Sequence, residues 1–353
     1  MSKVLETGHE AVNPIHPTML GKMDPVFVDL YNEHVAHTPN GKIDLPLLRK
    51  NYSKIYSYGT APAPDIKDIK DVAFKAEDGS EIILRIYRPN DSKKDELLPV
   101  HIDFHGGGWG LGDLDTESHV LKHYCAKARI AIVDVDYRLI PEYAFPTGLT
   151  DCFEATKYVH QNAEKLGFNK DSISIGGVSA GGNICLAVDH LCRDIGLKLK
   201  LVCAGTPQVD DIQSYATAAD SPYFSTQECE FAPTLNWARL KWFDSLKWSS
   251  LSKDQGEYDL QVAKMGWFKS IMTAPNWKGL SKTVIYTAGC DPMRDEGEAY
   301  AQKLITNGNE VVFKRFEGVP HPFMHMDAAL WQASSFIDLT AKELALAHGT
   351  IGW

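Results

Sequence analysis

The sequence predicts an α/β fold, in which an eight-stranded, mostly parallel sheet is flanked by helices and carries a helical cap. Three observations support this prediction. Short apolar runs rich in β-branched residues alternate with stretches of helical periodicity from about residue 100 onwards. Two earlier apolar runs are joined by a tight-turn sequence. A long aromatic-rich segment interrupts the alternation and greatly exceeds the usual length of a connecting loop.

The first two predicted strands cover residues 71–75 and 81–87. Asp78 and Gly79 lie between them, and both residue types tolerate the positive φ angles of a hairpin turn, so we expect the strands to pair antiparallel. The next six strands are short and largely apolar, which is typical of parallel strands buried on both faces. These six cover residues 100–104, 130–135, 172–176, 199–204, 283–287 and 311–316.

Stretches with the 3.6-residue periodicity of helices lie between most of these strands. Parallel strands need long crossover connections, and helices in this role cover the two faces of the sheet. The predicted helices cover residues 118–127, 149–166, 180–195, 297–306 and 327–348.

Two regions fall outside the alternation of strands and helices. Residues 1–60 precede the first strand, and residues 206–280 separate two core strands and contain five of the eight tryptophans. We expect these regions to form a cap over an apolar pocket at the carboxyl edge of the sheet. The α/β core then comprises residues 61–205 and 281–353. The same aromatic residues would also suit the core of a small helical subdomain, and the two interpretations are compatible.

The composition narrows the classes of partner. The formal net charge is −10, and no block of Lys and Arg could neutralise a phosphate backbone, so we expect no nucleic-acid partner. No run approaches the roughly 18 apolar residues of a membrane span, and the first residues lack a signal-peptide pattern. Seven scattered cysteines without a Cys-x-x-Cys pair indicate reduced thiols. These features predict a cytoplasmic protein.

The sequence Gly177-Val-Ser179-Ala-Gly181 lies directly between an apolar strand and a helical run. A serine in such a strand-to-helix turn has a strained backbone that lifts its hydroxyl clear of the sheet, and glycine at the two flanking positions avoids a collision. The turn also brings the unpaired amides of the helix N-terminus close to the serine. Ser179 is therefore the candidate nucleophile, and the alternative is a structural glycine turn.

Three consecutive glycines follow a predicted strand and precede Trp109. Such a run is conformationally costly unless a close approach of the backbone is required. Amides without side chains can approach the negative oxygen of a tetrahedral intermediate. We expect the amides of Gly106, Gly107 and Ala180 to form an oxyanion hole, and Gly108 and Trp109 to contact substrate. A tight turn after the strand is the structural alternative.

A nucleophilic serine needs a base and a carboxylate that orients this base, and we expect both after later strands, in the order Ser, Asp, His. Asp291 directly follows a predicted strand, so it is the candidate carboxylate. Asp295 and Glu296 lie where the next helix begins, and their expected role is to compensate the charge of the helix N-terminus. His321 follows the last strand and is the candidate base, with His325 as its competitor.

We expect no metal and no cofactor. His321 and His325 have a spacing found in some metal sites, but Pro322 interrupts the pair and no acidic ligand motif accompanies it. His348 lies at the end of the last predicted helix, away from this loop. The phosphate-binding motifs Gly-x-Gly-x-x-Gly and Gly-x-x-x-x-Gly-Lys do not occur.

Together these motifs resemble the hormone-sensitive-lipase-like branch of the α/β hydrolases, whose members are esterases and lipases. The resemblance implies the α/β-hydrolase fold, Ser179 as nucleophile, Asp291 as orienting carboxylate, His321 as base, and a cap formed by the amino-terminal segment and an insertion. It rests on His105-Gly-Gly-Gly-Trp109 with Gly112-Asp113, Tyr137-Arg138-Leu-Ile-Pro141-Glu142, Gly177-Val-Ser-Ala-Gly-Gly-Asn183, Asp291-Pro-Met-Arg-Asp-Glu-Gly297 and His321-x-Phe323.

Two positions depart from the pattern of this family. Val178 stands where the family usually has Asp, which leaves the chemistry intact but bears on the substrate. Pro322 stands where the family usually has Gly, and a proline restricts the backbone of the residue before it, here His321, to extended conformations.

The expected reaction is the hydrolysis of small to medium apolar carboxylic esters through an acyl-enzyme. Lactones and aryl amides proceed through the same type of intermediate and are alternative substrates. A receptor for small molecules on the same scaffold, as in the plant gibberellin receptors that share this architecture, is the alternative without catalysis. The resemblance also implies a homodimer formed through the final strand or helix.

Overall fold

The computed structural model describes residues 12–38, 44–55 and 58–350. The strands are β1 (Asp68–Lys75), β2 (Glu81–Arg88), β3 (Leu98–Phe104), β4 (Ala131–Asp136), β5 (Phe168–Val178), β6 (Val202–Gly205), β7 (Thr283–Ala288) and β8 (Val311–Phe316). They form one eight-stranded sheet in the order β1-β2-β4-β3-β5-β6-β7-β8. β2 pairs antiparallel with β1 and β4, and all other neighbours are parallel. The predicted fold class is therefore confirmed.

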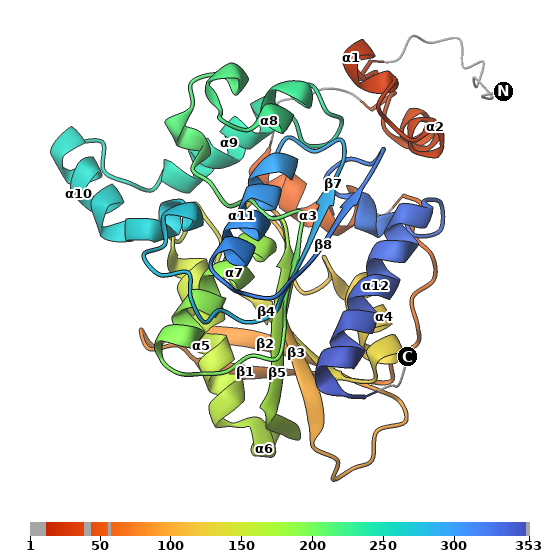
Figure 1. Cartoon of the computed structure of the whole chain (residues 1–353), viewed down its shortest axis with the longest axis vertical. Helices are drawn as coiled ribbons and strands as arrows, with labels where there is room; N and C mark the ends of the chain where they lie inside the picture. Colours follow the sequence, from red (N-terminus) through yellow and green to blue (C-terminus); the bar gives the residue numbers. More distant parts are fainter. Residues whose placement is uncertain (1–11, 39–43, 56–57, 351–353) are drawn as a thin grey trace.

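Helices cover both faces of this sheet (Figure 1). Helices α4 (Ser118–Ala128) and α12 (Trp331–His348) lie on one face, and α5 (Thr147–Gln161), α7 (Ala180–Asp194) and α11 (Arg294–Thr306) lie on the other. Successive strand residues point to opposite faces, so Ile132 packs in the cluster of α4 whereas Val133 packs in the cluster of α7. Burial on both faces explains why the parallel strands are so apolar.

Seven of the eight strands differ in extent from the prediction by one or more residues, β5 and β6 among them. The strand predicted at residues 172–176 in fact begins at Phe168. The prediction missed this start because residues 169–171 are polar and exposed, and so interrupt the apolar pattern. The strand predicted at residues 199–204 is shorter, and Val202 is its first residue.

The helix predicted at residues 149–166 is divided into α5 and α6 (Ala163–Leu166). Asn162 lies at the break, and its Nδ2 donates a hydrogen bond to the carbonyl oxygen of Tyr158 at 2.9 Å. Asparagine side chains compete in this way with the backbone hydrogen bonds of a helix, which explains the interruption.

The helix predicted at residues 327–348 begins only at Trp331. The Oδ1 atom of Asp327 accepts hydrogen bonds from the amide of Ala61 at 3.0 Å and from Nε2 of His119 at 2.9 Å. These long-range bonds hold the residues before α12 in a turn.

Residues 206–280 form short helices joined by turns. Figure 1 shows α8 and α9 at the same end of the molecule as the N-terminal helices α1 and α2. Of the predicted N-terminal segment, residues 1–11, 39–43 and 56–57 lie outside the described residues, as do residues 351–353 of the predicted core. These elements are α1 (Pro17–Leu20), α2 (Pro25–His34), α3 (Leu45–Ile55), η1 (Ile212–Ser214), η2 (Ala218–Asp220), α8 (Phe224–Glu228), α9 (Trp237–Trp248), α10 (Gln255–Met265), η3 (Gly266–Lys269) and η4 (Ile271–Thr273).

All seven cysteines are buried and free, as their scattered spacing predicts. Burial raises the pKa of Cys125 and Cys229 to about 12, which keeps these thiols protonated at neutral pH. In the part of the chain that the structure describes, no helix combines the length and apolarity that crossing a membrane requires.

Candidate active site

Ser179 lies in the turn between β5 and α7 with φ 58° and ψ −119°. A positive φ is strained for serine and persists only where the surrounding structure enforces it. A Cβ atom on Gly177 or on Gly181 would overlap the carbonyl oxygen of Phe104 in β3. The two glycines therefore let the turn pack directly against β3. The Ser179 amide donates to the carbonyl oxygen of Gly205 at 2.9 Å, which anchors the turn to β6.

His321 and Asp291 form a buried pair in which Nδ1 and Oδ2 lie 2.7 Å apart. Asp291 follows β7, and its Oδ1 accepts a hydrogen bond from the amide of Met293 at 2.9 Å. His321 lies in the loop after β8, so the ends of two adjacent parallel strands bring the pair together. Because a carboxylate can only accept, the proton of the imidazole lies on Nδ1, and Nε2 is left to accept a proton.

The two alternative carboxylates lie in the first turn of α11, and neither is bonded to His321 in the structure. Asp295 accepts hydrogen bonds from Nε of Arg294 and from the amide of Ser225, each at 2.7 Å. Glu296 is buried and accepts a hydrogen bond from the amide of Val209 at 2.9 Å, and burial raises its pKa well above the ordinary range. Both carboxyl groups therefore hold segments of residues 206–280 against α11.

The alternative histidines also have other partners. His325 ends the short helix η5 (Phe323–His325), and its Nε2 lies 3.5 Å from Oε2 of Glu117. Burial lowers the pKa of His325 to about 4. His348 ends α12, where its two ring nitrogens each lie 2.8 Å from a serine hydroxyl, those of Ser172 and Ser174. Each imidazole is thus directed away from the candidate carboxylate.

Ser179 and His321 line the same cavity. Helix α9 closes one side, where the ring of Phe243 occupies the space that a side chain at Gly108 would need. Tyr52 of α3 contributes from the N-terminal region. The lining residues are Tyr52, Gly107, Gly108, Ser179, Gln208, Thr234, Leu235, Arg239, Leu240, Phe243, Met293, His321 and Pro322.

The glycine loop differs in one respect from the sequence expectation. The amide of Gly106 donates to Oε1 of Glu117 at 3.3 Å and is therefore engaged. Gly107 and Gly108 line the cavity described above, whereas Gly106 lines a second cavity that also contains Ser179 and His321. Ala180 is the first residue of α7, where backbone amides have no partner within the helix.

Trp109 is not among the residues that line this cavity, and its contact with substrate stays a prediction. Its side chain is buried because its ring packs edge-on against Phe145, with 5.8 Å between the ring centroids. The ammonium group of Lys247 lies 4.8 Å from the indole ring on another side. Trp109 thus packs against Phe145 and against Lys247 of α9.

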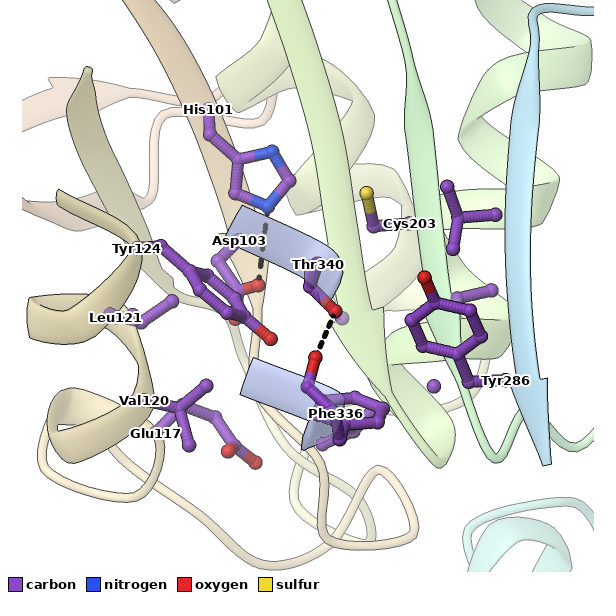
Figure 2. A pocket seen from close by; sticks show the side chains of 15 residues that line it. His101, Asp103, Glu117, Val120, Leu121, Tyr124, Cys203, Tyr286, Phe336 and Thr340 are labelled. Carbon is purple, nitrogen blue, oxygen red and sulfur yellow. Dashed lines mark hydrogen bonds and ion pairs between the residues drawn. The ribbon is translucent and has the colours of Figure 1, made fainter. Parts of the chain in front are cut away.

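Glu117 was not singled out from the sequence, where it reads as a polar residue before a helix. Glu117 lines a second cavity together with Ser179 and His321. It also lines an internal cavity between the sheet, α4 and α12. Figure 2 shows this internal cavity, in which His101 and Asp103 form an ion pair at 3.6 Å. Burial raises the pKa of Glu117 to about 8, and the nearby Asp103 adds to the shift.

A group of three potential metal ligands lies apart from these cavities. His119 and His123 on α4, and Asp327 before α12, place ligand atoms within 4.8 Å of one another. Nε2 of His119 is hydrogen-bonded to Asp327 at 2.9 Å. The three residues are absent from the lining of both cavities that contain Ser179.

Known proteins are similar to this chain in sequence. The family model described as the alpha/beta hydrolase fold matches residues 101–325. An AB hydrolase superfamily protein of Schizosaccharomyces pombe is 31% identical over 92% of this chain and 94% of its own length. An arylesterase of Saccharolobus solfataricus is 31% identical over 80% of this chain and 86% of its own length.

A solved structure supports the same relationship. The esterase of Pyrobaculum calidifontis has a TM-score of 0.79 and 28% identity, and the match covers 92% of this chain and 98% of that chain. The chain therefore belongs to the α/β-hydrolase-fold family, in the esterase and lipase branch that its motifs resemble.

Proposed function

We propose that this protein is a carboxylesterase that cleaves small to medium apolar esters through an acyl-enzyme on Ser179. The observation that carries the proposal is the pair of Asp291 and His321, joined at 2.7 Å, in a cavity that also contains the strained Ser179. The arylesterase and esterase to which the chain is similar support the same reaction.

In the proposed reaction, Oγ of Ser179 attacks the ester carbonyl while Nε2 of His321 takes its proton. Asp291 keeps the imidazole in the tautomer with a proton on Nδ1 and stabilises the imidazolium. His321 then protonates the departing alcohol. Water, deprotonated by the same imidazole, cleaves the acyl-enzyme and restores the serine.

The tetrahedral intermediate needs hydrogen-bond donors for its oxyanion. Among the predicted donors we retain the amides of Gly107 and Ala180. We replace Gly106 by Gly108, because the Gly106 amide is engaged by Glu117 while Gly108 lines the cavity. One such donor contributes roughly 3 to 4 kcal/mol to transition-state stabilisation.

We propose that residues 1–60 and 206–280 form the cap, and that residues 61–205 and 281–353 form the catalytic core. Tyr52 and Phe243 support this division, because they come from the two cap regions and line the cavity of Ser179. Other aromatic residues of the insertion serve packing. Trp277, for example, is buried with its ring 4.8 Å from that of Tyr300.

We also propose a cytoplasmic location, supported by the free buried thiols, and a homodimer in solution. Light scattering coupled to size-exclusion chromatography tests the dimer, because a dimer of this 39.2 kDa chain has twice the monomer mass.

The activity is tested with 4-nitrophenyl esters from acetate to decanoate, using the protein and its Ser179→Ala variant. We expect the fastest turnover on short to medium chains, and a loss of at least about 10³-fold in the variant. A parallel panel of lactones and aryl amides tests the alternative substrates. Turnover of the esters that is equal in the variant would rule out the proposed nucleophile.

A further inference from the structure

Arg239 introduces a permanent charge into an otherwise mostly uncharged cavity. It lies on α9 and lines the cavity that contains Ser179 and His321. Of the described residues that line this cavity, none is acidic, and apart from His321 the others carry no charge. Leu235, Leu240 and Phe243 are among them and form an apolar wall.

The guanidinium of Arg239 has no anionic partner within the described residues. Its Nη1 atom is enclosed by protein and has no hydrogen-bond partner there. The contact that holds the group is the ring of Trp242, whose centroid lies 5.2 Å from Cζ. Arginine retains its charge in proteins, so this half-buried group stays a cation beside the cavity.

Arg138 and Arg294, whose side chains are little exposed, are both neutralised by a carboxylate. Arg138 donates to the buried carboxylate of Asp151 at 2.6 Å, and Arg294 pairs with Glu228 at 2.8 Å. Enclosing part of a charged group without a partner is unfavourable, and an anionic group of a ligand would supply the missing partner of Nη1. Arg239 therefore has the properties of a binding group.

We infer that the esters cleaved at this site carry a carboxylate, and that Arg239 binds it. This inference rests on the proposed esterase function and narrows its substrate class. The planar guanidinium matches a carboxylate through two parallel hydrogen bonds, while the apolar wall receives the body of the substrate. The carboxylate takes no part in bond breaking, so Arg239 determines specificity and the hydrolytic steps are unchanged.

Matched pairs of substrates test this inference on either side of the ester bond. On the acyl side, the 4-nitrophenyl monoester of adipic acid is compared with 4-nitrophenyl hexanoate, which has the same chain length without the charge. On the alcohol side, 4-acetoxybenzoate is compared with 4-acetoxybenzamide. For each pair the ratio of the kcat/KM values, charged over neutral, is measured in the protein, Arg239→Gln and Arg239→Lys.

We expect the ratio for at least one pair to fall roughly 10- to 100-fold in Arg239→Gln, because a hydrogen-bonded charge pair is lost. Arg239→Lys retains the charge without the bidentate geometry, so its ratio should lie between that of the unchanged protein and that of Arg239→Gln. Lys264→Gln is the control, because it removes an exposed positive charge from α10 in the same region and leaves the ratio unchanged. The intrinsic reactivity of each ester cancels when the ratios are compared between variants.

Ratios that change less than about twofold in Arg239→Gln for both pairs would overturn the inference while the esterase function stands. Absence of turnover on all four esters would instead contradict the proposed function. In that case, calorimetry on Ser179→Ala still tests the binding role of Arg239. The Ser179→Ala variant should bind the charged ester of a pair roughly 10-fold more tightly than the neutral ester, and equal affinities would overturn the inference.

Discussion

The amide of Gly106 donates a hydrogen bond to the carboxyl group of Glu117 at 3.3 Å. This bond links the glycine loop to the start of α4 and engages one of three successive glycine amides beside Ser179. Burial raises the pKa of Glu117 to about 8, so the carboxyl group is largely protonated in the folded protein at neutral pH.

The stability of the protein should therefore depend on Glu117 and pH. In the unfolded chain the pKa returns to about 4.5, so between pH 4.5 and 8 the folded state holds a proton that the unfolded state lacks. The contribution of this group is complete below about pH 4.5 and is lost as the pH rises through about 8. Glu117→Gln keeps an acceptor for Gly106 without this titration. Its free energy of unfolding should therefore decline less between pH 5 and 8, by a few kcal/mol.

Urea unfolding at pH 5, 6.5 and 8 measures this difference. Glu164→Gln is the matched control, because its carboxylate is exposed and its removal should leave the pH dependence unchanged. Parallel pH profiles for the protein and Glu117→Gln would contradict the proposed protonation of Glu117.

Asp291→Asn should lower kcat/KM by roughly 10³- to 10⁴-fold on 4-nitrophenyl butyrate. An amide at this position can donate to Nδ1 of His321 and so favours the tautomer that cannot accept the proton of Ser179. Asp295→Asn is the control, because its bonds are to Arg294 and Ser225. Its kcat/KM should stay within about tenfold. A kcat/KM in Asp291→Asn above a tenth of the normal value would argue against Asp291 as the orienting residue.

Gly181→Ala should abolish activity and destabilise the fold by at least about 3 kcal/mol, because the added methyl group overlaps the carbonyl oxygen of Phe104. Thermal unfolding and esterase assays measure the two effects. Gly256→Ala is the comparison, since it is exposed in the first turn of α10 and its nearest neighbour would lie 3.4 Å from the new atom. A Gly181→Ala variant as stable and active as Gly256→Ala would refute the tight packing of the turn.

Phe243→Ala should shift the preference towards longer acyl or alcohol chains, because the ring closes the cavity beside Gly108. The ratio of kcat/KM for 4-nitrophenyl decanoate over butyrate should rise about tenfold, as several methylene groups gain room. Phe224→Ala on α8 is the control, since this phenylalanine is exposed and outside the cavity lining. An unchanged ratio in Phe243→Ala would mean that the ring does not limit chain length.

Much of the fold could be predicted because its signals are local. Apolar β-branched runs mark most strands, and the glycines around Ser179 mark a turn that only small residues fit. The positions of Asp291 and His321 after consecutive strands follow from the rule that parallel strands end at one edge of the sheet. The ends of helices and strands were harder to predict. Asn162 interrupts a stretch with helical periodicity, and the exposed polar residues 169–171 interrupt the apolar pattern of β5.

Other features of the site depend on residues distant in sequence. Glu117 engages the amide of Gly106, and no local pattern shows that its carboxyl group is buried beside the glycine loop. Trp109 packs against Phe145 and Lys247, so only the tertiary structure separates a packing role from a binding role. Arg239 reads as one of many charged helix residues until its neighbours are known.

The most direct test of the central claim is covalent labelling of Ser179. Diethyl 4-nitrophenyl phosphate is added to the protein, and the bound phosphoryl groups are located by peptide mass spectrometry while hydrolysis of 4-nitrophenyl butyrate is followed. The account predicts one diethylphosphoryl group per chain on Ser179, a proportional loss of hydrolysis, and no labelling of Ser179→Ala. Hydrolysis that persists when Ser179 is fully labelled, or a label that falls on another residue, would contradict it.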